Sequence, residues 1–370
     1  RAGADYNRPM PSSTPQPTEI SEALSQRVLG QEDAVREVSI AVAKRLAGLV
    51  TGNILMIGSS GTGKTSLMRA VELFLAADPE LAKHSTLVRV HANVLAEQTV
   101  EGRAGEVLLT RILDRAREQL GDDAPLEAVL DRASQAVVFV DEIDKIRSVV
   151  GGQANVPGIR AQEALLTLIE NEAVPFTLPA WAGGKTVTLD ASGLLFVAAG
   201  AFEGLYDSVY DRVTIGADRG SLQSVSVMGE GKVHEELNFA LRDWLRYEDL
   251  FDYGLTPQFL SRFDALVLLN DLGEDELLKI FLEGEDSGLH QARAYFEAMG
   301  LELAMSPAAA RRIAAEATRQ PRLGARALKE VFRRVMRSYE FEPQRFATDG
   351  TVIVDLDEVE EALTGQQGLR

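Results

Sequence analysis

The sequence predicts an α/β protein in which a large domain, with a parallel sheet covered by helices, precedes a smaller, α-rich domain. The apolar run at residues 53–57 leads into a glycine-rich loop and then into a segment with helical spacing of apolar residues. A second apolar run, at residues 137–140, ends in two carboxylates. From about residue 271 the alternation of strands and helices gives way to mainly helical patterns, which indicates the second domain.

The glycine-rich loop has the spacing of a phosphate-binding loop. Residues 58–65 read GSSGTGKT and match the pattern G-x-x-x-x-G-K-[ST]. The glycines let backbone N–H groups converge on phosphate oxygens, and the following helix adds a partial positive charge. Lys64 is expected to reach the β- and γ-phosphates, and the Thr65 hydroxyl to bind Mg²⁺. The alternative is a glycine-rich turn that contains a lysine by chance. The predicted nucleotide-binding residues are Ser60, Gly61, Thr62, Gly63, Lys64, Thr65 and Ser66.

The second motif is the apolar run that ends in Asp141 and Glu142. Ligands of open α/β sheets bind at the carboxyl ends of the strands, where these two carboxylates are expected to lie. Asp141 is expected to hold Mg²⁺ directly or through water, and Glu142 to polarise the water that attacks the γ-phosphate. An acidic helix start would look similar. Because the phosphate-binding loop accompanies it, the pattern favours nucleotide hydrolysis.

Composition narrows the class of protein. The 370 residues include no cysteine, which excludes disulfides and thiolate metal sites. Four histidines lie without metal-ligand spacing, and no apolar run is long enough for a membrane span. With no visible signal peptide, a cytoplasmic protein is expected. The net charge of −18 argues against general nucleic-acid binding but leaves room for a local basic patch.

The chain divides into four segments. Residues 1–20 are proline-rich at the start and are expected to be a disordered tail. Residues 21–268 form the large nucleotide-binding domain, and glycine-rich stretches at 148–160 and 214–232 are expected to be long functional or mobile loops. Residues 269–364 form the small domain, and 365–370 a second tail. The predicted strands of the large domain are Ile54–Ile57, Leu87–His91, Val137–Val140, Leu194–Ala198 and Ala265–Leu269.

The small domain has its own order of elements. A long amphipathic stretch over residues 274–300 comes first. Short strands are predicted at Leu301–Met305 and Thr351–Val354. Helices are predicted at Pro307–Thr318, from near Gly324, and at Leu356–Thr364.

Four further segments, together with the two motifs above, carry a family resemblance. They are residues 28–34 (VLGQEDA), 196–205 (FVAAGAFEGL), 255–262 (LTPQFLSR) and 322–328 (RLGARAL). In order and spacing the six segments resemble the AAA+ ATPases of the Clp/Hsp100 group, most closely ClpX, with HslU as a near relative. The likeness covers about residues 20–360 and implies ATP and Mg²⁺ as cofactors, a P-loop domain followed by a lid domain, and a hexameric ring of identical subunits.

The resemblance also implies residue roles. Val28 and Leu29 would pack against adenine, and residues 196–205 would surround the sensor 1 position. Arg262 would reach the nucleotide of the neighbouring subunit, where a guanidinium stabilises charge on the transferred phosphoryl group. Arg326 would contact phosphate in its own subunit. With Lys64 and Glu142, these two arginines complete the predicted catalytic set.

The chain departs from the family pattern in several places. The family's pore loop reads Gly-aromatic-hydrophobic-Gly, whereas the matching residues here are Gly102, Arg103, Ala104 and Gly105. Arginine lacks the apolar grip of an aromatic ring, so Arg103 favours an acidic partner over generic unfolding. The zinc module of ClpX has no counterpart, and Ala199 stands where HslU has a polar sensor residue. Residues 214–217 lack the aromatic of a peptidase-docking loop, and residues 181–185 replace the basic pore-entrance loop.

Three functions follow for testing. The leading one is a ring-forming, ATP-hydrolysing motor that remodels a protein substrate or works with an adaptor; the missing docking residues argue against a peptidase partner. The first alternative is a nucleic-acid-acting AAA+ motor, in which Arg103 and Arg160 line a basic pore, although the net charge opposes it. The second is a scaffold whose assembly is controlled by nucleotide.

Overall fold

The computed structural model describes residues 14–49, 52–99, 104–170, 173–215, 224–229, 232–237 and 241–364. These residues form two compact units. The first unit holds the described residues of Leu49–Ile57 and Asp78–Leu268, and the second those of Asp5–Gly48, Gly58–Ala77 and Leu269–Arg370. The division into a large domain and a lid at residue 268 stays a prediction, because the phosphate-binding loop, the helix after it and the described residues up to 48 fall in the second unit.

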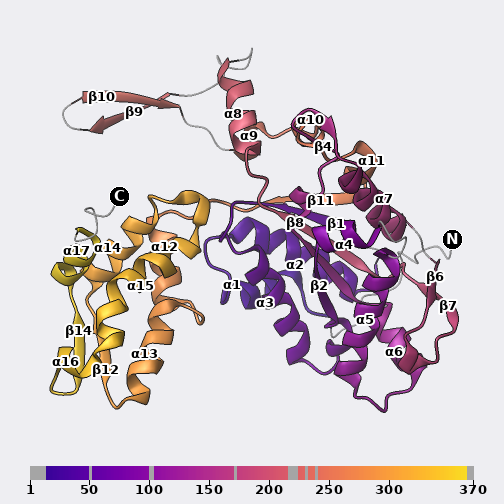
Figure 1. Ribbon diagram of the computed structural model, residues 1–370, viewed down its shortest axis with the longest axis horizontal. Helices are drawn as coiled ribbons and strands as arrows, with labels where there is room; N and C mark the ends of the chain where they lie inside the picture. The colour runs from indigo at the N-terminus through magenta and orange to yellow at the C-terminus, as the bar shows by residue number, and fades with distance from the viewer. Residues whose placement is uncertain are drawn as a thin grey trace. The chain divides into compact units, whose positions relative to one another are not determined.

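A five-stranded parallel sheet is the centre of the first unit (Figure 1). Its order is β11-β1-β8-β3-β2, and every neighbouring pair is parallel. This confirms the predicted α/β class and all five predicted strands. The strands are β1 (Asn53–Ile57), β2 (Leu87–His91), β3 (Val137–Asp141), β8 (Leu195–Gly200) and β11 (Phe263–Leu268).

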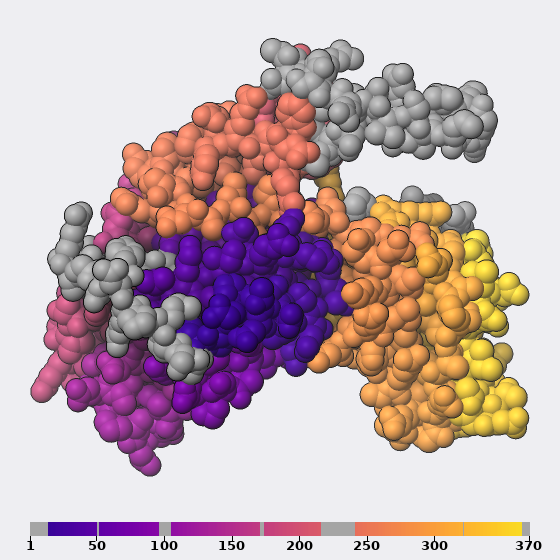
Figure 2. Space-filling model, turned by 180° about the vertical axis from the view of Figure 1, so that it is seen from behind, coloured from indigo at the N-terminus to yellow at the C-terminus, as the bar shows by residue number. Residues whose placement is uncertain are grey.

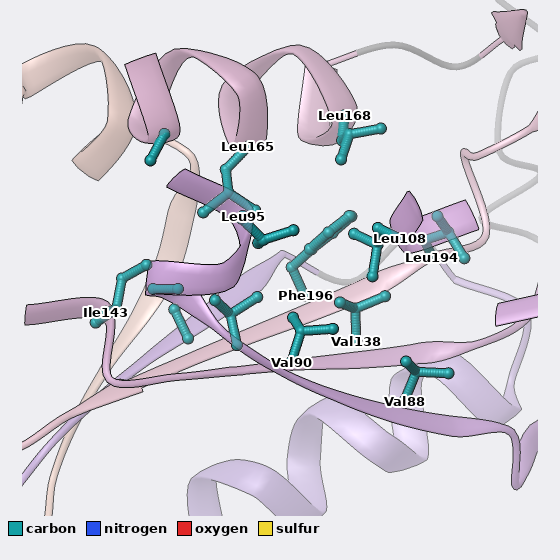
Figure 3. Close-up of a cluster of buried hydrophobic side chains, with 14 of the residues drawn as sticks. Val88, Val90, Leu95, Leu108, Val138, Ile143, Leu165, Leu168, Leu194 and Phe196 are labelled. Carbon is teal, nitrogen blue, oxygen red and sulfur yellow. The ribbon is translucent and has the colours of Figure 1, made fainter. Parts of the chain in front are cut away.

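Three helices cover one face of this sheet: α4 (Ala92–Thr99), α5 (Ala104–Leu120) and α7 (Val156–Glu170). Alternate residues of each strand point to this face, so Val88, Val90 and Val138 meet leucines of the helices (Figure 3). Phe196 of β8 points into the same cluster. The residues in the other phase of β3, such as Phe139, are buried too, which explains why the strand is apolar throughout.

The glycine-rich stretch at 148–160 is not a long loop, so this prediction was wrong. It forms a hairpin of β4 (Val149–Val150) and β5 (Gln153–Ala154) and then enters α7. Gly151 and Gly152 form the two-residue turn of the hairpin, with φ of +59° and +77°. Turns of this kind have positive φ at both central positions, which glycine adopts easily. The described part of the stretch at 214–232 includes β9 (Ser224–Gly229), paired with β10 (Lys232–Leu237).

The remaining elements of the first unit surround this framework. They are η1 (Ala82–His84), α6 (Leu126–Ala133), η2 (Ile143–Lys145), the hairpin of β6 (Ala173–Thr177) and β7 (Thr186–Asp190), η3 (Ala180–Ala182), α8 (Leu205–Ile215), α9 (Leu241–Trp244), α10 (Tyr247–Tyr253) and α11 (Pro257–Leu260).

The second unit begins with α1 (Pro17–Ser25), α2 (Glu32–Leu46) and α3 (Lys64–Ala77). Helix α1 starts inside the segment predicted to be a tail, because Pro17 suits the first helical position and Ile20 and Leu24 are buried. The amphipathic stretch at 274–300 is two helices, α12 (Glu274–Glu283) and α13 (Gly288–Ala298), separated at Gly284.

The C-terminal elements of this unit pack into one body around Phe281, Phe296 and Phe332 (Figure 2, orange to yellow). They include β12 (Glu302–Met305), α14 (Pro307–Ala317), η5 (Pro321–Leu323), α15 (Ala325–Phe341), α16 (Pro343–Phe346), β13 (Ala347–Thr348), β14 (Thr351–Val354) and α17 (Leu356–Thr364). Among the described residues of either unit, no helix is long and apolar enough to cross a membrane.

Candidate nucleotide-binding site

The phosphate-binding loop is built in the way that its sequence predicts. Gly61 and Gly63 have φ of +74° and +106°, which side chains rarely allow. The Thr62 side chain is buried, and its hydroxyl donates to the Ser59 carbonyl at 2.9 Å. The Lys64 ammonium donates to the carbonyls of Gly58 and Ser59 at 2.5 and 2.8 Å. Lys64 also begins α3, so the helix N-terminus and the lysine charge act on the same loop.

Thr65 and Ser66 occupy the first turn of α3 and are exposed. A hydroxyl and a carboxylate are hard oxygen donors of the kind that Mg²⁺ takes when it shares its shell with phosphate oxygens and water. By its donor chemistry each of the two residues, Thr65 in the second unit and Asp141 in the first, suits the metal role predicted for it.

The predicted sensor 2 segment docks on the phosphate-binding loop within the second unit. The Arg326 guanidinium donates to Ser60 Oγ at 2.5 Å, and the Ala325 N–H donates to the Gly61 carbonyl at 3.1 Å. Two glycines permit this approach. A Cβ on Gly61 would lie 2.2 Å from the Leu323 carbonyl, and one on Gly324 would lie 2.8 Å from the Gly61 carbonyl. Arg326 thus lies beside the loop where a phosphate would bind.

The segment predicted to face adenine lies next to the same loop. Val28 is buried, with Cγ1 3.9 Å from where a Cβ of Gly63 would be, and Leu29 is half-buried. A cavity of about 350 Å³ opens in this unit. Apolar walls combined with hydroxyls suit a base and its ribose. Its lining includes Leu29, Thr65, Ser66, Phe281, Ala325 and Leu328.

Gln31, for which the sequence suggested no role of its own, fixes this segment. Its buried amide donates to the Asn270 carbonyl at 2.8 Å and accepts from the Asn270 N–H at 2.9 Å. The pair of hydrogen bonds ties the residues beside the cavity to the start of the C-terminal segment.

The two carboxylates of the second motif lie where β3 ends in the first unit: Asp141 is its last residue and Glu142 follows it. Asp141 is 8% exposed, and its Oδ1 accepts the Glu142 N–H at 2.9 Å. Its Oδ2 forms an ion pair with the guanidinium of Arg89 on β2. Glu142 has a left-handed backbone with φ of +58°, an uncommon conformation that turns its side chain out of the strand. That side chain is 50% exposed, so water can reach it, and its Oε2 lies 3.7 Å from His91 Nδ1.

The residues around the sensor 1 position lie on the next strand. Ala199 of β8 is buried and stands between Met56 and Asp141 in the sheet register. A methyl group there cannot donate a hydrogen bond to a ligand. Asp144, which follows the motif, is buried beside Lys145 with Nζ 3.3 Å from Oδ2, and its Oδ1 accepts the Ala201 N–H at 3.2 Å.

Arg262 lies away from these carboxylates. It follows α11 and directly precedes β11, whereas Asp141 is the last residue of β3. The Arg262 guanidinium pairs with Glu170 at the end of α7. All strands of a parallel sheet begin on one side of the sheet and end on the other, so Arg262 lies on the side where the strands begin. The five-residue strands separate the two sides by about 16 Å, and β11 and β3 are three positions apart in the sheet.

The predicted pore loop is described only in part. Gly102 and Arg103 lie outside the described residues, while Ala104 opens α5 and Gly105 is in its first turn. A Cβ on Gly105 would lie 3.3 Å from Leu168 Cδ2, so this glycine allows α5 to pack closely against α7.

Comparisons with known proteins agree with this architecture. A family profile described as "AAA domain (Cdc48 subfamily)" matches residues 50–266. The ATP-dependent Clp protease ATP-binding subunit ClpX of Bacteroides fragilis is 30% identical over 350 residues, covering 89% of this chain and 77% of its own length. The chain belongs to the AAA+ ATPases. ClpX 3 of Methylococcus capsulatus is 29% identical over 377 residues, covering 94% of this chain and 81% of its own length. The protein is thus a ClpX-like AAA+ ATPase that binds and hydrolyses ATP, which confirms the resemblance and the enzyme class predicted from the motifs.

Proposed function

We propose that the chain is the subunit of a ring-forming motor, by likeness a hexamer, that uses Mg²⁺·ATP in the cytoplasm to remodel a protein partner. Lys64 of the phosphate-binding loop and Arg326 of α15 would contact the phosphates, and the Thr65 hydroxyl would bind the metal. Asp141 adds a metal ligand, and Glu142 positions the attacking water. Mg²⁺ held there would neutralise charge on the phosphates as the γ-phosphoryl group is transferred.

The position of Arg262 is the observation that best supports assembly into a ring. Arg262 immediately precedes β11, so it lies at the opposite end of the strands from Asp141, the last residue of β3, and from Glu142, which follows it. The Arg262 side chain is too short to span about 16 Å along the strands and reach Glu142 of its own subunit. In a ring, the side of one subunit's sheet where the strands begin can face the side of its neighbour's sheet where the strands end. Arg262 therefore acts on the nucleotide of that neighbour.

Mixed rings test this arrangement. Lys64→Ala should lose nucleotide binding or turnover, Glu142→Gln should bind ATP without hydrolysing it, and Arg262→Ala should form rings with low turnover. Mixing Glu142→Gln with Arg262→Ala should restore activity, because about a quarter of randomly formed interfaces pair an intact Arg262 with an intact Glu142. No recovery in mixed rings would refute action between subunits, and undiminished turnover by Glu142→Gln would refute the hydrolytic assignment.

We infer that the partner is a protein with an acidic segment, because Arg103 stands at the sequence position of the family's pore-loop aromatic. The substitution of the aromatic by arginine supports a specialised client or adaptor, and the sequence of residues 214–217 supports work without a peptidase. Glu142→Gln rings held with ATP should retain a defined polypeptide and release it when nucleotide is removed. Release of nuclease-sensitive material instead would identify a nucleic-acid motor, and rings that hold neither would identify a scaffold.

A further inference from the structure

The edge strand β2 presents its basic side chains to the carboxylates of β3. Val88 and Val90 point into the core, so Arg89 and His91 lie on the opposite face, where both are exposed. Arg89 stands opposite Phe139 in the register, and His91 opposite Asp141. From there the Arg89 guanidinium lies 5.9 Å from the centre of the Phe139 ring and reaches diagonally to Asp141 Oδ2.

Both oxygens of Asp141 are therefore engaged by its own chain. Oδ1 accepts the Glu142 N–H, and Oδ2 pairs with Arg89. The Asp141 side chain is only 12% exposed, so water compensates little of its charge, and a buried carboxylate needs a cation or several hydrogen bonds. Arg89 supplies that cation at Oδ2, the oxygen that does not accept the Glu142 N–H.

We propose that Arg89 is the resting counter-ion of Asp141, and that Mg²⁺ arriving with ATP displaces it. This inference rests on the proposed role of Asp141 as a metal ligand. Two cations that share one carboxylate repel each other, so binding of Mg²⁺ must overcome the Asp141–Arg89 attraction. The Arg89 side chain is 44% exposed and can turn into solvent when it is released. Arg89 thereby sets the Mg²⁺ concentration that nucleotide binding requires.

Binding of ATP by rings that cannot hydrolyse it measures this effect directly. Proteins carrying Glu142→Gln would be held at a fixed, subsaturating ATP concentration while Mg²⁺ is varied, and bound ATP would be counted by equilibrium dialysis. Adding Arg89→Gln should lower the half-saturating Mg²⁺ concentration by about fivefold or more, the usual size of coupling between two binding events. Arg89→Lys, which keeps the charge, should return the value towards that of the parent.

Thermal unfolding without nucleotide gives a second readout. Arg89→Gln should melt below the parent because Asp141 loses its partner, and millimolar Mg²⁺ alone should recover more of its stability than it adds to the parent. The double substitution Arg89→Gln with Asp141→Asn should show the Mg²⁺ dependence of Asp141→Asn alone, because Arg89 then has no carboxylate for which to compete.

The outcomes separate this inference from the function on which it rests. If Asp141→Asn raises the Mg²⁺ requirement but Arg89→Gln leaves it unchanged or raises it, competition by Arg89 is refuted and Asp141 remains a ligand. If Asp141→Asn leaves the requirement unchanged, the metal role of Asp141 itself is refuted. A lower requirement in Arg89→Gln, restored by lysine, supports the exchange of one cation for the other.

Discussion

Gln162 of α7 ties together two segments that lead to residues of the proposed site, and its replacement by leucine should be strongly destabilising. Its buried amide donates to the carbonyls of Ile146 and Gly254 at 2.7 and 2.9 Å. The amide oxygen accepts the Thr256 N–H at 2.8 Å. Ile146 follows the motif of Asp141, and Thr256 caps α11, which leads to Arg262.

The magnitude follows from the backbone groups that lose a partner. The Gly254 carbonyl keeps two hydrogen bonds from Ser148, at 2.7 Å from the N–H and 2.9 Å from the hydroxyl. The loss therefore falls on the Ile146 carbonyl and the Thr256 N–H. Each buried backbone group left without a partner costs about 1–3 kcal/mol. Leucine retains most of the packing volume, so the cost comes mainly from these two groups, and we expect Gln162→Leu to lower the free energy of unfolding by about 2–6 kcal/mol.

Tryptophan fluorescence can follow this change in the right part of the chain. Both tryptophans, Trp181 and Trp244, belong to the first unit. Urea unfolding of Gln162→Leu should shift to lower concentration with the slope unchanged. Glu163→Ala, at the exposed neighbouring position of α7, is the matched control and should change stability by less than about 0.5 kcal/mol. A loss as small as the control's in Gln162→Leu would refute the reasoning.

Three further predictions concern other parts of the chain. Gly324→Ala should weaken ATP binding by about tenfold, as measured by equilibrium dialysis. A side chain at φ of +49° is strained by about 1–2 kcal/mol, and the new Cβ would lie 2.8 Å from the Gly61 carbonyl. Phe296→Ala, at a position with no exposure, should cost about 3–5 kcal/mol in a denaturation curve, against less than about 1 kcal/mol for Tyr295→Ala beside it. Burial raises the pKa of Tyr253 to about 12, above its ordinary value near 10, so the folded state favours the neutral phenol. That stabilisation is present below about pH 10 and lost as pH rises towards 12, and Tyr253→Phe should flatten this loss in unfolding midpoints measured across the range.

The sheet could be predicted because each of its strands has a recognisable local sequence pattern. An apolar run such as residues 137–140, ended by a charged residue, is buried wherever it lies, and helical spacing between runs leaves a parallel sheet as the simple arrangement. The short hairpin at residues 149–154 was missed for the opposite reason. Its strands are two residues each, too short for an alternating pattern, and its glycines resemble those of a mobile loop.

The partners of the site residues could not be predicted in the same way. Arg89 and Asp141 are 52 positions apart in the chain, and their pairing depends on β2 lying beside β3. Gln162 appears in the sequence as an ordinary polar residue of a helix, and only the fold reveals that it faces three backbone groups. Motifs identify groups that touch a ligand, because ligand chemistry fixes their spacing, whereas the groups that hold them are fixed by tertiary contacts.

The charged groups of the proposed site share one property that bears on how the motor works. Asp141 is paired with Arg89, and Arg262 with Glu170, within a single chain. Each of these contacts uses the group that Mg²⁺·ATP or a neighbouring subunit would engage. Binding must therefore exchange partners rather than fill open positions, and the free energy of binding is reduced by the contacts that are broken.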